Sequence, residues 1–315
     1  MKSICFIVPY FGKFPTYFPV WLKSCEFNPT VDFLIFTDDH REFDLPGNVK
    51  LHYTSFENIQ ERIQQCFDFK VSISKPYKLC DYKVAYGEIF AKELEEYDFW
   101  GYCDIDLIWG DIRSFYTDEL LEQYDKIGCQ GHATIFRNSL EINRIYKDEN
   151  NDGRFYKNIF QRDEVCATDV NFIRRRFESR HIKQYTETIY AGLLVMKPGF
   201  FLQALPKSLD YQNRHQVFLW EKGVLTRYYL VGGKVVSKPY LYIHFFKRPM
   251  KNLVKEWDRV LIYPDTYMNY YDDIDTKCIK RYGTKSYIAF IIRMIRQNKH
   301  RLSIKNAFLF IKRLF

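Results

Sequence analysis

The chain has 315 residues, of which 47% are hydrophobic and 27% are charged, and its formal net charge is +8. A chain of this length and composition can bury a large core, which excludes a mainly disordered protein. The positive charge favours an anionic partner such as a nucleotide, a phosphorylated lipid or an anionic membrane surface, and charge alone does not choose among them.

The eight cysteines form no C-x-x-C pair, and no histidine cluster has the spacing of a zinc site. We therefore expect free thiols in a reducing compartment. The apolar run before Pro9 is too short for a signal peptide or for a membrane span, so the sequence predicts a cytoplasmic protein.

The first elements predict a parallel α/β sheet. Short apolar runs that suit buried strands alternate with a helical segment, in the order Ser3–Val8 (strand), Tyr17–Cys25 (helix) and Val31–Phe36 (strand). Ligands of such sheets gather where the strands end. The loop after the first strand and the T-D-D that follows the second strand both lie there.

The later elements are predicted from periodicity and from turn residues. An amphipathic helix is expected over Lys78–Glu96, a strand over Phe99–Trp109, helical structure over Ile112–Tyr124 and a strand pair over Ile127–Asn138. The second half predicts an exposed loop at Lys147–Arg154, a strand at Ile189–Pro198, a helix near His215–Glu221, and strands at Gly232–Lys238 and Tyr240–Lys247.

Two carboxylates stand out in the stretch GYCDIDLIWGD, at Asp104 and Asp106. On a strand, residues two apart share a face, so these carboxylates would repel each other unless a cation compensates them. Mn²⁺ or Mg²⁺ suits such a pair, because both ions prefer oxygen ligands and can also bind phosphates. The alternative is that one carboxylate caps a helix or accepts backbone hydrogen bonds. The place at the end of a strand favours the metal site.

The order SICFIVPYFG, VDFLIFTDD, KLCDYKVAYGEIF and DFWGYCDIDLIWGD resembles that of bacterial GT-A-fold glycosyltransferases of capsular polysaccharide and lipopolysaccharide biosynthesis. The similarity is good over residues 1–130 and loose beyond them. It implies a Rossmann-like domain with a mixed, mostly parallel sheet. It also implies that the D-x-D motif binds a metal ion and the diphosphate of a nucleotide-sugar, most often a UDP-sugar.

The resemblance also implies roles for particular residues. Asp104 and Asp106 match the D-x-D, and His244 matches a late histidine that completes the metal shell. Residues of the nucleotide-sugar site would be Pro9, Tyr10, Phe11, Gly12, Thr37, Asp38, Asp104 and Lys247. Members of the family usually have a glycine between the late histidine and lysine, with another spacing, whereas this chain reads YIHFFKRP.

Transfer to a hydroxyl with inversion requires a base, and the candidates are Asp163, Glu164 and Asp169. Alternatively the acidic pair 163–164 is a favourable charge at a helix N-terminus. A retaining enzyme would need no such base. Lys78, near the start of the predicted long helix, is expected to contact donor phosphates, although such lysines are more often surface charges.

Residues 285–315 contain many lysines and arginines among apolar residues and no acidic residue. This pattern predicts basic amphipathic helices that lie on an anionic membrane surface. The alternative is a C-terminal helix that packs on the core.

The sequence therefore predicts a single GT-A domain over residues 1–284, with a nucleotide-binding part at 1–130 and an acceptor part at 131–284, followed by the basic tail. The expected activity is metal-dependent transfer from a nucleotide-sugar to a saccharide, often lipid-linked, at the inner face of the cytoplasmic membrane. The alternative is an inert GT-A-like protein that binds a saccharide or a partner chain. No nucleic-acid partner is expected, because the cations concentrate at the C-terminus and no recognition motif is present.

Overall fold

A computed structural model describes residues 1–148, 155–194 and 199–283 of the chain. These residues belong to two compact units, the first ending at Tyr190 and the second beginning at Ala191. The sequence predicted one domain with a subdivision after residue 130. The first unit extends further because residues 131–190 supply strands and helices that complete its sheet.

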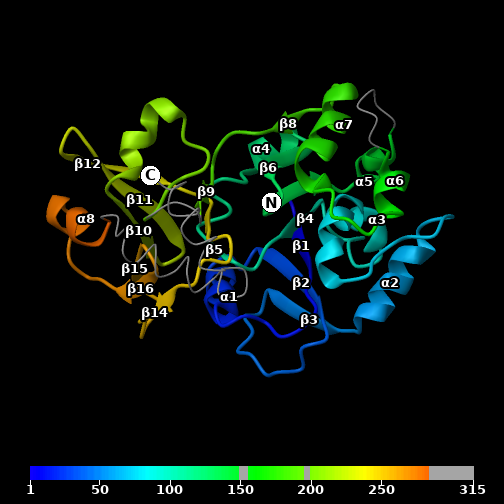
Figure 1. Ribbon diagram of the computed structural model, residues 1–315, viewed down its shortest axis with the longest axis horizontal. Coiled ribbons are helices and arrows are strands. Elements are labelled where there is room, and N and C mark those ends of the chain that lie inside the picture. The colour runs from blue at the N-terminus through cyan, green and yellow to red at the C-terminus, as the bar shows by residue number, and fades with distance from the viewer. Residues whose placement is uncertain (149–154, 195–198, 284–315) are drawn as a thin grey trace, which may run out of the picture. The chain divides into compact units, whose positions relative to one another are not determined.

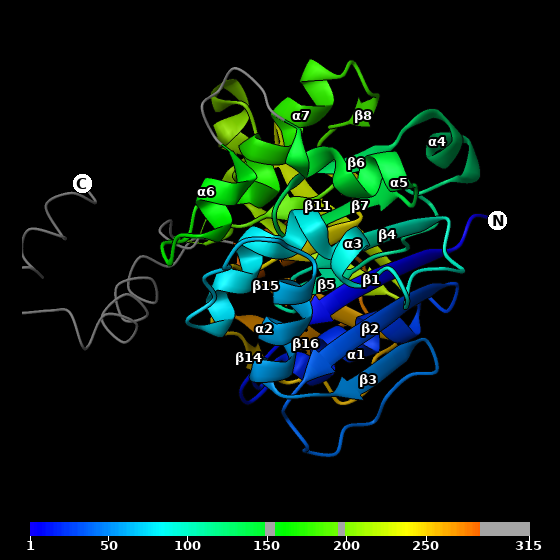
Figure 2. The ribbon, with the colours of Figure 1, turned by 90° about the vertical axis from the view of Figure 1, so that its right-hand side faces the viewer.

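The first unit contains a seven-stranded mixed sheet in the order β3-β2-β1-β4-β7-β6-β8. Figure 2 shows these strands in sequence from β3, in blue, towards β6, in green. The strands are β1 (Ile4–Pro9), β2 (Val31–Thr37), β3 (Val49–Tyr53), β4 (Phe99–Cys103), β6 (Lys126–Gln130), β7 (Ala133–Arg137) and β8 (Gln184–Tyr185). The pairs β1/β2, β2/β3, β1/β4 and β6/β8 are parallel, and the pairs β4/β7 and β6/β7 are antiparallel.

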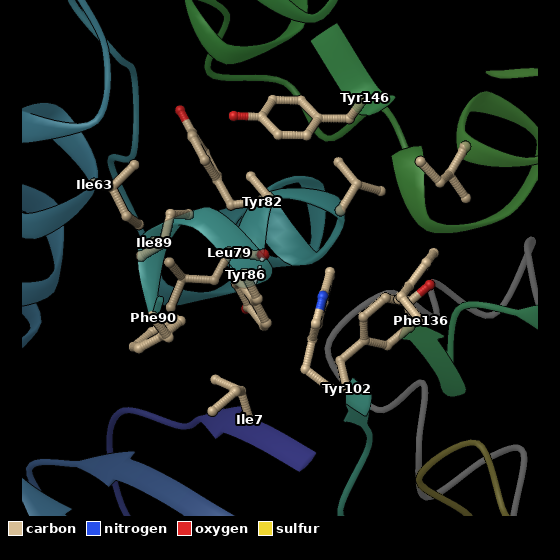
Figure 3. Packing of buried hydrophobic residues seen from close by; sticks show 14 of the residues in the cluster. Ile7, Ile63, Leu79, Tyr82, Tyr86, Ile89, Phe90, Tyr102, Phe136 and Tyr146 are labelled. Carbon is tan, nitrogen blue, oxygen red and sulfur yellow. Dashed lines mark hydrogen bonds between the residues drawn. The ribbon is translucent and has the colours of Figure 1, made fainter. Parts of the chain in front are cut away.

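Alternation along β1 supplies both faces of this sheet. The ring centre of Phe6 lies 5.3 Å from that of Phe33, in an aromatic cluster that also includes Trp21 of the helix α1 (Phe18–Glu26). Ile7 points to the opposite face, where it belongs to a large apolar cluster. Figure 3 shows Ile7 there with Tyr86 and Tyr102. Burial on both faces explains why β1 reads as a continuous apolar run.

The helices of the first unit are short. They are α1 (Phe18–Glu26), α2 (Phe56–Gln65), α3 (Tyr86–Ile89), α4 (Asp118–Gln123), α5 (Leu140–Arg144), α6 (Tyr156–Phe160) and α7 (Ile173–Ser179). The unit also contains the 3₁₀ helices η1 (Pro76–Ala85) and η2 (Ile145–Lys147) and the π-helix η3 (Thr168–Phe172).

The predicted α-helix over Lys78–Glu96 is wrong in type. The segment forms a 3₁₀ helix, η1, followed by the single-turn helix α3. With three residues per turn, η1 presents three straight rows of side chains. Two of the rows are buried, and both contact residues 159–168. The segment is therefore buried over more of its circumference than the single stripe of an amphipathic helix.

The strand predicted over Phe99–Trp109 is interrupted. It consists of β4 and a separate short strand, β5 (Leu107–Trp109), with a bend at residues 104–106. Helical structure predicted over Ile112–Tyr124 is limited to α4. The strand pair predicted over Ile127–Asn138 is confirmed as β6 and β7.

The second unit contains a six-stranded, mostly antiparallel sheet in the order β12-β11-β10-β15-β16-β14 (Figure 1). The strands are β10 (Gln216–Glu221), β11 (Val224–Val231), β12 (Lys234–Pro239), β14 (Lys251–Asn252), β15 (Arg259–Tyr263) and β16 (Thr266–Asn269). Two further short strands, β9 (Ala191–Gly192) and β13 (Tyr242–His244), pair in parallel. The helix α8 (Thr276–Tyr282) packs on β10 and β11, and η4 (Lys207–Asn213) precedes β10.

The prediction of a helix near His215–Glu221 is wrong, because residues 216–221 form the strand β10. The strand pairs with β11 through a two-residue turn, Lys222 and Gly223, with φ of 46° and 87°. Positive φ at both turn positions matches the twist of a hairpin. The strand predicted over Gly232–Lys238 is confirmed as β12, and Tyr240–Lys247 contains β13. Of the strand predicted over Ile189–Pro198, β9 is present, and residues 195–198 lie outside the described part.

All eight cysteines are free thiols, as predicted. Within the part of the chain that the structure describes, no helix has the length and apolar character needed to cross a bilayer. The basic tail 285–315 and most of the predicted loop at Lys147–Arg154 lie outside the described residues.

Candidate metal centre

Three neighbouring parallel strands of the first unit end at the same edge of its sheet. Pro9 of β1 is in register with Phe36 of β2, and Ile7 of β1 is in register with Tyr102 of β4. The residues that follow β1, β2 and β4 therefore meet at one edge, which is where parallel sheets bind ligands.

The loop after β1 is bonded to the end of β2. The Asp38 carboxylate accepts a hydrogen bond of 2.7 Å from the Gly12 N–H, and the Tyr10 N–H donates to the Phe36 carbonyl at 2.8 Å. Gly12 has φ of 88°, a conformation that favours glycine. The structure thus brings together the predicted residues Pro9–Gly12 and Asp38. Thr37 is buried, and its hydroxyl accepts a hydrogen bond from the Asp39 N–H.

Asp39 also stabilises the segment that follows β1. Its carboxylate accepts a 2.8 Å hydrogen bond from the Phe14 N–H and binds the Arg41 guanidinium. The hydrogen bond from Arg41 lowers the pKa of Asp39, and the bond from Phe14 acts in the same direction although burial opposes both. The carboxylate is therefore ionised at neutral pH, and it contributes stability that is lost only as strong acid protonates it.

Asp104 and Asp106 lie in the bend between β4 and β5. Each offers a carboxylate oxygen, and these two oxygens lie within 4.8 Å of each other. Asp106 is 8% exposed, whereas the Asp104 side chain is 36% exposed. The prediction that the two carboxylates lie together is confirmed. The reason given for it, alternation along one strand, is wrong because the bend sets their directions.

The charge of Asp106 acts on the loop after β1. Burial raises the pKa of Tyr10, and the negative charges of Asp106 and Asp39 raise it further. Tyr17 shows the same pattern, since burial and then Asp106 raise its pKa. The D-x-D carboxylates and the predicted nucleotide loop therefore share one local environment in the first unit.

Lys83 joins Asp104 to a third carboxylate. Its Nζ lies 2.8 Å from Asp104 Oδ1, 3.5 Å from Asp169 Oδ2 and 2.7 Å from the Gly131 carbonyl oxygen. Burial disfavours the charged form, but Asp104 and Asp169 hold the pKa of Lys83 well above its usual value. The site predicted from the sequence does not include Lys83, which there is one of three lysines close together, with Lys75 and Lys78.

Asp169, one of the three predicted base candidates, is linked to Asp104 because Lys83 contacts both carboxylates. Burial raises its pKa, and Lys83 opposes that shift. Gly131 permits the close packing, because a Cβ at that position would lie 2.2 Å from Asp169 Oδ2. The Tyr102 hydroxyl also donates a hydrogen bond to the Asp169 carbonyl at 3.1 Å.

Asp163 and Glu164 have other surroundings. The exposed Asp163 carboxylate accepts hydrogen bonds from Ser72 Oγ at 2.9 Å and from the Ser74 N–H at 3.3 Å. The side chains of Ser74 and then Ser72 lower its pKa, and the Ser74 N–H acts in the same direction. Glu164 is exposed, and its carbonyl accepts a hydrogen bond from Lys78. The contacts of Asp163 tie the loop to residues 72–74 and do not involve the Asp104–Lys83–Asp169 group.

Lys78 is fully buried. Its Nζ donates to Asp81 Oδ2 at 2.8 Å, to the Ile159 carbonyl at 3.1 Å and to the Glu164 carbonyl at 2.7 Å. An ammonium group has three N–H donors, so these bonds use all of them. The structure gives Lys78 a role inside the fold in place of the predicted phosphate contact.

His244 and Lys247 belong to the second unit. His244 ends β13, is buried, and has its ring centre 4.2 Å from that of Phe246. Phe246 and the exposed Lys247 both have positive φ, 51° and 57°. Phe246 thus adopts a backbone conformation that favours glycine. The predicted roles of His244 as a metal ligand and of Lys247 as a phosphate contact stay predictions.

Taken by itself, the first unit is an α/β protein with a cluster of carboxylates at the carboxyl edge of a mostly parallel sheet. The chain belongs to a family of unknown function, DUF6625, whose model matches residues 6–271. No curated protein matches the sequence. The family match covers most of both units and leaves the function to be inferred from the site.

Proposed function

We propose that this protein is a metal-dependent glycosyltransferase of the GT-A type that uses a nucleotide-sugar, preferably a UDP-sugar, as donor. The observation that carries the proposal is the pair of carboxylate oxygens of Asp104 and Asp106, within 4.8 Å of each other, beside the loop after β1. Asp104, Asp106 and Asp169 carry three negative charges when ionised and Lys83 carries one positive charge, so two negative charges are left. One divalent cation would balance them.

The donor set fits Mn²⁺ or Mg²⁺, which take oxygen ligands and leave positions for phosphate oxygens. Asp104 and Asp106 would hold the ion, and His244 is the further ligand that we propose from the sequence. Each of these three residues offers one atom that can bind a metal ion. When bound, the ion would stabilise the negative charge of a leaving diphosphate.

The other roles follow from residues of the chain. The loop Pro9–Gly12 and Asp38, which are bonded to each other, would bind the nucleoside. Lys83 holds Asp104 by one carboxylate oxygen, Oδ1, which restricts the orientation of that side chain. In the second unit, Lys247 would contact the diphosphate.

Among the three base candidates we choose Asp169. A base must lie close to the reacting groups and accept a proton at the working pH. Asp169 is linked to Asp104 through Lys83, and burial raises its pKa, whereas hydrogen bonds lower that of Asp163. If transfer inverts the anomeric centre, Asp169 would accept the proton of the acceptor hydroxyl.

Release of UDP from a panel of nucleotide-sugars in the presence of Mn²⁺ tests the proposal. We expect slow hydrolysis of at least one donor, and we expect Asp169→Asn to lower that turnover by about 100-fold while Mn²⁺-dependent UDP binding persists. Asp163→Asn is the matched control and should retain activity. Hydrolysis of no donor, with intact saccharide binding, would favour an inert GT-A-like binding protein. An Asp163→Asn variant as inactive as Asp169→Asn would refute the choice of base.

We also propose that the basic segment 285–315 places the enzyme on the inner face of the cytoplasmic membrane, where a lipid-linked saccharide is available. This part rests on the sequence pattern alone. Sedimentation with vesicles that contain anionic lipid measures the association. We expect the full chain to sediment and a chain ending at Tyr282 to stay in the supernatant, and equal sedimentation of both would contradict the role of the tail.

A further inference from the structure

The 3₁₀ helix η1 has one row of side chains that is not buried in the core. Residues three apart eclipse each other in a 3₁₀ helix, so Tyr77, Cys80 and Lys83 form a single row, which we call the Tyr77 row. The two other rows are buried at Lys78, Asp81 and Val84, and at Leu79, Tyr82 and Ala85. In the Tyr77 row, by contrast, Tyr77 is 62% exposed, and Cys80 and Lys83 are partly exposed.

The far end of this row is fixed in the candidate site. Lys83 lies 2.8 Å from Asp104 and 3.5 Å from Asp169, as described above. Because the row is straight, Tyr77 lies on the side of η1 that carries these carboxylates. Electrostatics agree with the geometry, since burial and then the neighbouring Cys80 and Asp104 raise the pKa of the Tyr77 hydroxyl, and Asp169 acts in the same direction.

Cys80 separates the ring from the charges without adding a charge of its own. Burial, with help from Asp81 and Asp169, raises the pKa of its thiol to about 12, so it is neutral under ordinary conditions. The Tyr77 row therefore offers an exposed aromatic ring, a small neutral spacer and then a group of carboxylates bound to a lysine.

We propose that the Tyr77 row is the binding surface for a sugar ring of the saccharide acceptor, with Tyr77 as the residue that stacks on the ring. A sugar has an apolar face of C–H groups and a rim of hydroxyls. It matches an aromatic side chain that stands next to hydrogen-bonding carboxylates. The nucleoside is proposed to bind at Pro9–Gly12 and Asp38, whereas Asp169, the proposed base, lies on the Lys83 side. The choice of a saccharide rests on the proposed glycosyltransferase function.

Saccharide binding to the full chain tests this inference. The probes are methyl glycosides of glucose, galactose and N-acetylglucosamine, added with UDP and Mn²⁺ and followed by saturation-transfer NMR and titration. We expect at least one glycoside to bind, Tyr77→Ala to weaken its Kd about tenfold, and Tyr77→Trp to keep it within about threefold. Tyr271→Ala is the control, because Tyr271 is also 62% exposed and its acidic neighbours, Asp258 and Glu256, are not residues of the proposed site.

The measurements separate this inference from the proposed function. Mn²⁺-dependent UDP binding should change by less than about twofold in Tyr77→Ala, because stacking on the acceptor leaves the donor site intact. Absence of glycoside binding to the native chain, an unchanged Kd in Tyr77→Ala, or an equal loss in Tyr271→Ala would overturn the inference. A loss of UDP affinity as large as the loss for the glycoside would assign Tyr77 to the nucleotide instead. If the native chain binds glycosides through Tyr77 but binds no UDP, the glycosyltransferase proposal fails and the saccharide surface stands.

Discussion

Replacing Asp104 and Asp106 together by asparagine should weaken Mn²⁺ binding by at least about 100-fold and abolish Mn²⁺-dependent UDP binding. Asparagine keeps the shape of the side chain but removes both negative charges from the pair of oxygens that lie within 4.8 Å of each other. Manganese titration followed by electron paramagnetic resonance measures the metal, and calorimetry with UDP measures the nucleotide. The variant should fold, because repulsion between two close carboxylates is removed as well.

Asp111→Asn is the matched control for this variant. Asp111 lies in the same stretch of sequence, but its carboxylate accepts hydrogen bonds from the Arg113 and Ser114 N–H groups at 3.0 and 3.2 Å. An asparagine amide oxygen can accept the same bonds, so stability and Mn²⁺ binding should both persist. Unchanged Mn²⁺ and UDP affinity in the Asp104/Asp106 variant would remove the metal site and with it the proposed function.

Lys78→Met should lower the free energy of unfolding by about 3–5 kcal/mol. The side chains of Lys78 and Asp81 are both fully buried and lie 2.8 Å apart. Removing the ammonium leaves the Asp81 carboxylate buried without its cation, and it leaves the carbonyls of Ile159 and Glu164 without this donor. Urea unfolding measures the loss.

Two variants complete this test. Lys75→Met, at an exposed position just before η1, should change stability by less than about 0.5 kcal/mol. Adding Asp81→Asn to Lys78→Met should recover part of the loss, because no unpaired charge is then buried. Wild-type stability in Lys78→Met, combined with lower UDP affinity, would contradict the buried pair and restore the phosphate contact predicted from the sequence.

The Lys78–Asp81 pair also positions the proposed base. Asp81 accepts hydrogen bonds from the Cys166 N–H, and its carbonyl accepts one from Thr168 Oγ1 at 2.8 Å. These contacts join η1 to the turn before Asp169. A partly unfolded Lys78 variant would therefore lose the base as well as stability. The activity and the UDP affinity of this variant therefore have to be measured well below the unfolding midpoint, where the chain is still folded.

The three lysines near η1 have surroundings that the sequence does not reveal. The sequence predicts an α-helix of 3.6 residues per turn here and singles out Lys78, among Lys75, Lys78 and Lys83, as the phosphate contact. The 3₁₀ winding turns Lys78 towards Asp81 in the interior and Lys83 towards Asp104 and Asp169. The number of residues per helical turn therefore decides which of these lysines lies beside Asp104. The 3₁₀ helix packs against residues 159–168, and contacts with such distant residues cannot be predicted from the sequence of the helix alone.

The sequence by itself determined the first half of the sheet and the place of the candidate site. The runs Ser3–Val8 and Val31–Phe36 are apolar throughout because both faces of those strands are buried, and the carboxylates at 104 and 106 stand out because charge is rare in such surroundings. Only the tertiary structure decided that Asp104 and Asp106 lie in a bend, that Asp169 and not Asp163 is linked to Asp104 through Lys83, and that residues 216–221 form a hairpin strand. The physical reason is that each of these features depends on a partner distant in sequence, whereas burial on both faces of a strand is already visible in its own residues.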